Sequence, residues 1–140
     1  MNLKLDHIGV VVGNIEESQA YYKKNYGFDA VTKKFFEPAH GVNVLFINIG
    51  YGQTPAIELI EPINEKSKVY NFLKKTGGGF HHLAYQVDDI KEAIEHYKNK
   101  KSLVITQIVP GAGHGNVPTV WLYTPQKNLV ELIEIKNDQS

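Results

Sequence analysis

The stretch DHIGVVVGNIEESQAYYKK, residues 6–24, returns in altered form as HHLAYQVDDIKEAIEHYKN, residues 81–99. His7 aligns with His82, and the match continues along both segments. Self-similarity over this length indicates two copies of one supersecondary unit, neither of which buries a complete core alone. The chain is therefore interpreted first as a duplication.

A second match lies near the far end of each copy. AIELIEP around Glu58 pairs with LVELIEI around Glu131, at nearly the same offset as the two histidines. Each copy thus carries one histidine near its start and one glutamate near its end. Two related copies can bring His7, His82 and both glutamates to one point near a pseudo-twofold axis. Imidazole and carboxylate groups in that number describe a metal site.

Length, charge and cysteine content narrow the classes of function. The 140 residues suit one compact domain, and 15 basic residues balance 15 acidic ones. A formal charge of zero argues against broad binding to nucleic acid or to a membrane surface. The chain has no cysteine, so a metal must be held by imidazole and carboxylate groups.

The N-terminal residues MNLKLDHIG form a strand pattern with no basic and apolar leader. No apolar run approaches the roughly 18 residues that a membrane-spanning helix requires. We therefore expect a cytoplasmic protein that binds neither membrane nor nucleic acid.

The order of predicted elements indicates an α+β fold made of two β-α-β-β-β modules. The modules are residues 1–62 and 80–136, joined by a helical linker at 63–79. In each module a helix follows a capping-box-like start, at Asn14 and at Asp89, with glutamate three residues later. The strands are predicted at residues 3–12, 30–36, 42–49, 55–61, 81–87, 103–109, 119–123 and 128–135.

Side chains alternate faces along a strand, which places Glu58 in apolar company beside Ala56 and Ile60. A carboxylate there is expensive to bury without a partner, and a metal ion is a suitable one. Taken singly, a strand histidine is more often a hydrogen-bonded core residue and a strand glutamate more often solvated. The recurrence of both in each copy favours a divalent ion, which can be Zn, Ni, Co, Fe or Mn.

Other polar and aromatic residues carry weaker predictions. Glu61 lies at a strand end, where a solvated side chain is expected. His40 and His114 lie in glycine-containing loops and are expected to be exposed, although His114 could reach a bound substrate if its loop closes. Phe46 and Trp121 lie in strands and are interpreted as core or cavity wall.

The segments LDHIGVVV, HGVNVLFINIG, AIELIEP, GGGFHHLAYQVDDI and LVELIEI together resemble the vicinal oxygen chelate superfamily, which has the glyoxalase and bleomycin-resistance fold. The resemblance covers nearly the whole chain. It implies paired modules that curl into an open, barrel-like cavity around a divalent metal. Carrying the ligand pattern over assigns the metal to His7, Glu58, His82 and Glu131. It also implies a homodimer.

Within the superfamily the match is to the branch that epimerises methylmalonyl-CoA, which implies a metal-dependent, enolate-forming isomerase acting on that or a similar 2-substituted acyl thioester. Glu131 and Glu58 are the expected proton-transfer pair. The chain departs from this branch in two places. Some epimerases have a further glutamate in the third strand, near Val44 here, and the hairpin before the last strand, TPQKNLVEL, is shortened.

Three other activities occur on the same fold. A glyoxalase-I-type lactoylglutathione lyase, which acts on a thiol conjugate, needs the same four ligands. A non-catalytic small-molecule binding or resistance protein commonly lacks them. A ring-cleaving dioxygenase usually binds Fe(II) with two histidines and one glutamate, so Glu58 as a fourth ligand argues against it.

Overall fold

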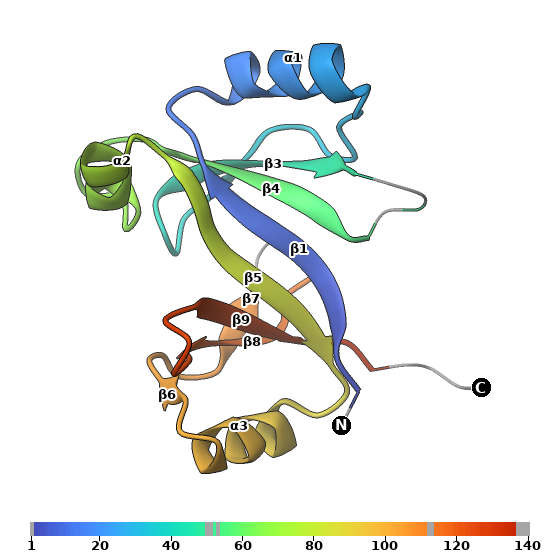
Figure 1. The fold of residues 1–140 in the computed structure, drawn as a ribbon, viewed down its shortest axis with the longest axis vertical. Coiled ribbons are helices and arrows are strands. Elements are labelled where there is room, and N and C mark those ends of the chain that lie inside the picture. The colour runs from blue at the N-terminus through green and yellow to red at the C-terminus, as the bar shows by residue number, and fades with distance from the viewer. Residues whose placement is uncertain (1, 50–51, 53, 112–113, 137–140) are drawn as a thin grey trace. The chain divides into compact units, whose positions relative to one another are not determined.

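The computed structural model describes residues 2–49, 52, 54–111 and 114–136, which divide by their contacts into two compact units. The first unit is His7–His81, and the second combines Met1–Asp6 with His82–Ser140. Each contains the succession of strand, helix and further strands that the sequence predicts (Figure 1). The α+β class is therefore confirmed.

The first unit has a four-stranded sheet in the order β2-β3-β4-β1. β1 runs parallel to β4, whereas β3 is antiparallel to both of its neighbours. Its strands are β1 (Lys4–Val11, from His7 onward in this unit), β2 (Phe35–Glu37), β3 (Val42–Asn48) and β4 (Ala56–Pro62).

The second unit repeats this pattern in the order β5-β9-β8-β6, with the short strand β7 also paired to β8. β5 and β9 are parallel, as β1 and β4 are, and β8 is antiparallel to its partners. Its strands are β5 (Gly79–Val87, from His82 onward in this unit), β6 (Leu103–Val104), β7 (Val109–Gly111), β8 (Val117–Tyr123) and β9 (Leu129–Glu134).

The two long helices begin where the capping pattern predicts. The side chain of Asn14 accepts a hydrogen bond from the backbone of Glu17, and Asp89 does the same with Glu92. These bonds satisfy backbone donors that a helix start leaves without an intrahelical partner. The helices are α1 (Ile15–Tyr26), α2 (Tyr70–Thr76) and α3 (Ile90–Asn99). Among the described residues, no helix is long and apolar enough to cross a membrane.

The apolar core is built on both faces of the first sheet but is centred on one face of the second. In the first unit, Leu45 and Leu59 belong to the cluster that α1 covers. Val44 and Ile60 belong to a cluster on the opposite face, against which α2 packs. In the second unit the core cluster lies on the face that α3 covers. We call the sheet face opposite α1, and the one opposite α3, the inner face.

Two predicted strands are wrong in length. Residues 30–36 form β2 only at their end, with an isolated bridge at Ala30, and residues 103–109 divide into β6 and the start of β7. In both places a threonine hydroxyl takes the role of a ladder acceptor. Thr32 Oγ1 accepts from the backbone of Phe46, and Thr106 Oγ1 accepts from that of Trp121. Such side-chain bonds compete with regular strand pairing, and hydropathy patterns do not register them.

Candidate metal and proton-transfer site

His7 and Glu58 lie together on the inner face of the first unit. β1 and β4 are paired in parallel with Gly9 opposite Glu58, so His7, two residues earlier, shares a face with the carboxylate. The His7 Nε2 atom is 3.5 Å from Glu58 Oε1. The histidine is completely buried, and the glutamate side chain is 14% exposed. Within this unit the structure brings the two side chains together.

The separation of these two atoms suits a shared divalent cation. An ion about 2.1 Å from each of two ligands in tetrahedral geometry holds the ligand atoms about 3.4 Å apart. The observed 3.5 Å is close to this value and long for a charge-assisted hydrogen bond. Imidazole nitrogen and carboxylate oxygen are also suitable donors for borderline divalent metals. His7 and Glu58 therefore fit the metal that the family pattern implies.

His82 and Glu131 hold the equivalent positions in the second unit. β5 and β9 pair in parallel with Ala84 opposite Glu131, which reproduces the register of the first unit. His82 is 5% exposed and Glu131 is 8% exposed, so both residues are more than nine-tenths buried. A carboxylate so buried requires polar or charged partners, as expected for a residue that binds a ligand or moves a proton.

An aromatic ring accompanies each histidine at a matched position. Phe46 lies opposite Glu58 in the β3–β4 pair, and Trp121 lies opposite Glu131 in the β8–β9 pair. Each ring meets its histidine edge to face, with centroids 5.4 Å apart for His7–Phe46 and 4.7 Å for His82–Trp121. Edge-to-face packing restricts the imidazole rotamer. The two aromatics are separated along the chain by the same offset as the two histidines, and this match could have identified them as site residues.

A second glutamate in each copy holds a helix rather than facing the site. Glu61 Oε2 accepts from the backbone of Ile15 at 2.8 Å, and Glu134 Oε2 accepts from that of Ile90 at 3.0 Å. Each bond ties the end of the central strand to the start of the helix of its own unit. The prediction that Glu61 is simply solvated was wrong, because the positive end of the helix attracts the carboxylate.

The second unit also contains a polar cluster on its inner face. Asp6 is 8% exposed, and its Oδ1 accepts from Gln86 Nε2 at 2.7 Å. His114 Nδ1 lies 3.8 Å from Asp6 Oδ2, and the His114 side chain is only 13% exposed. The prediction of an exposed His114 was therefore wrong. Residues 112 and 113 of its loop lie outside the described residues.

The structure thus pairs His7 with Glu58 in one unit and places His82 and Glu131 at equivalent positions in the other. That all four hold one ion remains a prediction.

Comparison with known proteins identifies relatives over nearly the whole chain. A family model described as the glyoxalase/bleomycin resistance protein/dioxygenase superfamily matches residues 6–119. A mitochondrial methylmalonyl-CoA epimerase of Dictyostelium discoideum is 35% identical over 134 residues, which cover 94% of this chain and 78% of the relative. An ethylmalonyl-CoA/methylmalonyl-CoA epimerase of Cereibacter sphaeroides is 33% identical over 94% of this chain and 98% of its own length.

A solved structure extends the likeness to three dimensions. A methylmalonyl-CoA epimerase variant of Streptomyces coelicolor, in complex with 2-nitronate-propionyl-CoA, superimposes with a TM-score of 0.79. It is 25% identical, and the match covers 94% of this chain and 96% of that one. The two sequence relatives and the protein of the solved structure are all epimerases, which are isomerases, and the solved structure shares the fold of this chain.

Proposed function

The chain belongs to the glyoxalase/bleomycin resistance protein/dioxygenase superfamily, and from this membership we propose that it is a metal-dependent epimerase of methylmalonyl-CoA or a similar 2-substituted acyl thioester. The observation that carries the proposal is the matched histidine and glutamate pair in each unit, in a chain whose named relatives are epimerases at 33% and 35% identity.

We assign the metal to His7, Glu58, His82 and Glu131. When bound there, a divalent ion supplies Lewis-acid stabilisation for negative charge that develops on a substrate oxygen. Support comes from the spacing of His7 and Glu58 and from the register that the second unit shares. Imidazole and carboxylate donors accommodate Zn, Ni, Co, Fe or Mn. Phe46 and Trp121 keep the two imidazole rings oriented.

The two glutamates supply the proton transfer. Removing the proton next to a thioester carbonyl leaves a planar enolate, and inversion requires that the proton return to the opposite face. Glu58 and Glu131 come from different units, so they are the natural pair for the two faces. Burial of Glu131 keeps water away from the carboxylate that exchanges the proton.

The homodimer, the cytoplasmic location and the absence of nucleic-acid and membrane partners stay predictions. The acyl group and the thiol carrier are part of the proposal, and both correspond to the substrates of the related epimerases.

The proposal is tested by deuterium exchange at the α-carbon of methylmalonyl-CoA in D₂O, followed by proton NMR. Protein loaded separately with each candidate metal is compared with metal-free protein. We expect fast exchange that depends on the metal and that falls by about 100-fold or more in Glu131→Gln. Glu134→Gln is the matched control, because this carboxylate lies on the same strand and caps α3. It should retain exchange.

Absence of exchange in fully metal-loaded protein would exclude methylmalonyl-CoA as the substrate. The same preparation is then tested with the hemithioacetal of glutathione and methylglyoxal, since a glyoxalase-type lyase needs the same ligands. Binding of neither substrate, together with no metal uptake, would instead favour a non-catalytic binding protein. Equal exchange in Glu131→Gln and in the unaltered chain would refute the assigned base.

A further inference from the structure

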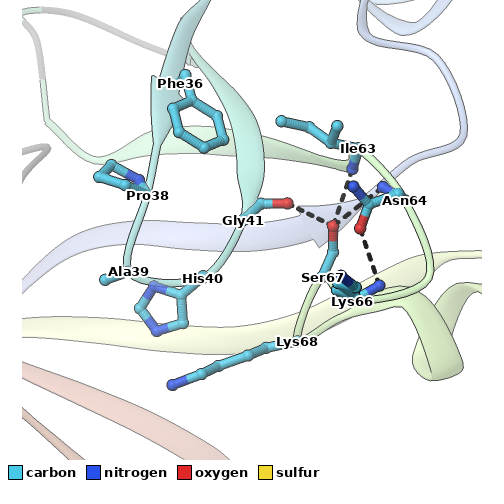
Figure 2. Close-up of a pocket in the computed structure, with 10 residues that line it drawn as sticks. All are labelled: Phe36, Pro38, Ala39, His40, Gly41, Ile63, Asn64, Lys66, Ser67 and Lys68. Carbon is cyan, nitrogen blue, oxygen red and sulfur yellow. Dashed lines mark hydrogen bonds between the residues drawn. The ribbon is translucent and has the colours of Figure 1, made fainter.

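A pocket away from the paired histidines lies between two loops of the first unit. One loop follows β2 at residues 38–41, and the other follows β4 at residues 63–68. The pocket has a volume of about 320 Å³ (Figure 2). None of the residues assigned to metal binding or proton transfer lines it.

Hydrogen bonds lock the two loops together. The Ser67 hydroxyl donates to the carbonyl of Gly41 and accepts from the backbone of Ile63 at 2.9 Å. The backbone of Lys68 donates to the carbonyl of His40 at 3.0 Å. Gly41 has a φ of +67°, and a Cβ added there would lie 3.5 Å from the Ser67 Cα. Ser67 is itself buried. The pocket is therefore a built feature with little freedom to collapse.

One side of the pocket carries an imidazole and two lysine side chains. His40 Nδ1 is 2.6 Å from Glu37 Oε2, and the same carboxylate accepts the His40 backbone at 2.9 Å. This contact fixes the ring and puts Nε2 on the side away from Glu37. Lys66 and Lys68 add two exposed ammonium groups to the lining. Imidazole and ammonium donors in this number suit a phosphate group.

The other side is apolar. Phe36 and Ile63 line it, and they are 54% and 48% exposed. Figure 2 shows the Phe36 ring and Ile63 along one margin, with His40 and Lys68 along the margin opposite. A ligand that fits both margins carries a flat or apolar group next to a phosphate. A purine nucleotide has this combination, because its base stacks on an aromatic ring while its phosphates meet the cations.

The position of the pocket relates it to the proposed substrate. From Glu58 to Ile63, five residues along and just beyond β4 span about 17 Å at roughly 3.4 Å per residue. The pantetheine arm of CoA has about as many backbone bonds as four amino-acid residues, so it reaches about 14 Å when extended. An acyl-CoA whose thioester lies at Glu58 thus places its nucleotide at a comparable distance.

From these observations we infer that the pocket binds the phosphorylated nucleotide end of an acyl-CoA, with Lys66, Lys68 and His40 on the phosphates and Phe36 on the base. The inference rests on the proposed function for the identity of the carrier. The pocket then determines which thiol carrier the enzyme accepts, whereas the paired histidines and glutamates perform the chemistry.

The test uses the metal-free 140-residue chain and adenosine 3′,5′-bisphosphate, which has the nucleotide and phosphates but no thioester. Calorimetric titration should show binding that Lys68→Ala and His40→Ala each weaken by about tenfold, the loss expected for one charge-assisted contact. Lys74→Ala is the matched control, because Lys74 lies on α2 outside the pocket. It should leave the affinity unchanged.

A second measurement follows turnover. Lys68→Ala should raise KM for methylmalonyl-CoA without changing kcat, and should leave the KM for methylmalonyl-pantetheine unchanged. Nucleotide binding without any thioester turnover would support the pocket and refute the proposed epimerase.

Three results would overturn the inference: no nucleotide binding, equal weakening by Lys74→Ala, or inorganic phosphate binding as tightly as the nucleotide. The last would identify a general anion site.

Discussion

The two units share a matched histidine and glutamate but differ in what surrounds them. Val11 and Val44 on the inner face of the first unit correspond to Gln86 and Thr119 in the second. In the first unit these positions belong to an apolar cluster that α2 closes. In the second, Gln86 binds Asp6 and Thr119 binds the backbone of β7. The compared inner-face positions are therefore apolar in the first unit and polar in the second.

Between the two units, strand register is preserved more strictly than amino-acid composition. The glutamate and aromatic positions keep equivalent strand partners in both units. The helix-capping glutamates likewise accept from the first residue of the helix in their own unit. Neighbouring inner-face positions tolerate a change between apolar and polar because each unit satisfies them locally.

The largest effect is expected when the histidine that each unit contributes to the metal site is removed. His7→Ala and His82→Ala should each lower metal affinity by at least about 100-fold, since both ligands are assigned to one ion. Exchange at the α-carbon should disappear with it. Metal content by mass spectrometry and circular dichroism on the same samples separate loss of metal from loss of fold. A variant that keeps full metal content would contradict the shared site.

The segment just before β5 packs closely against β1, and a substitution at Gly78 tests this contact. A Cβ at Gly78 would lie 2.6 Å from the Val11 carbonyl oxygen, at a φ of +102°. Gly78→Ala should therefore reduce the free energy of unfolding by about 3 kcal/mol or more. Gly77→Ala is the control, because its Cβ meets nothing within 4 Å, and it should cost about 1–2 kcal/mol for its positive φ. Urea unfolding measures both, and equal effects would refute the close contact.

Giving one inner-face position the residue of its counterpart in the other unit tests whether the apolar and polar surroundings are interchangeable. Thr119→Val leaves the Val109 carbonyl without its 3.0 Å donor, which should cost about 1–3 kcal/mol. Val44→Thr places a hydroxyl in the apolar cluster, at a cost of about 1–3 kcal/mol. Chemical unfolding of both single variants tests this. If either substitution left stability unchanged, the two inner faces would be interchangeable after all.

The helix-capping glutamates should behave alike in the two units. Glu61→Ala and Glu134→Ala each leave a helix N–H without its carboxylate acceptor, so each should lower stability by about 1 kcal/mol. Metal binding should persist in both. Thermal unfolding and metal titration are the measurements. Loss of metal in either variant would move that glutamate into the site.

The smallest expected effect concerns Tyr22 and Tyr97, which align with each other in the repeat. Burial raises the pKa of both phenols above the ordinary value of 10.0, with smaller contributions from Tyr26 at Tyr22 and from Tyr85 at Tyr97. Above pH 10 the folded state therefore binds more protons than the unfolded state, so stability declines as pH rises.

Tyr22→Phe and Tyr97→Phe should each flatten part of this decline. Urea midpoints at pH 9 and pH 11 measure it, and unaltered slopes in both variants would refute the role of burial.

Sequence reasoning succeeded wherever a local pattern carried the information. Both helix starts follow from Asn14 and Asp89 with their glutamates, and the α+β order follows from strand and helix periodicity. It failed for residues 30–36 and 103–109, where a threonine hydroxyl replaces a strand partner. It also missed the role of Glu61, because the helix start that this carboxylate caps lies 46 positions away in the chain.

The duplication, with one histidine and one glutamate in each copy, can be predicted from the sequence, because a repeat and its side-chain alternation are properties of the chain order. The folded structure was needed to show that His7 Nε2 and Glu58 Oε1 are 3.5 Å apart and that Phe46 and Trp121 pack on the histidines. It alone showed the pocket between the loops after β2 and β4. Those facts depend on strand register and loop closure between distant segments, which the free energy of the whole fold selects.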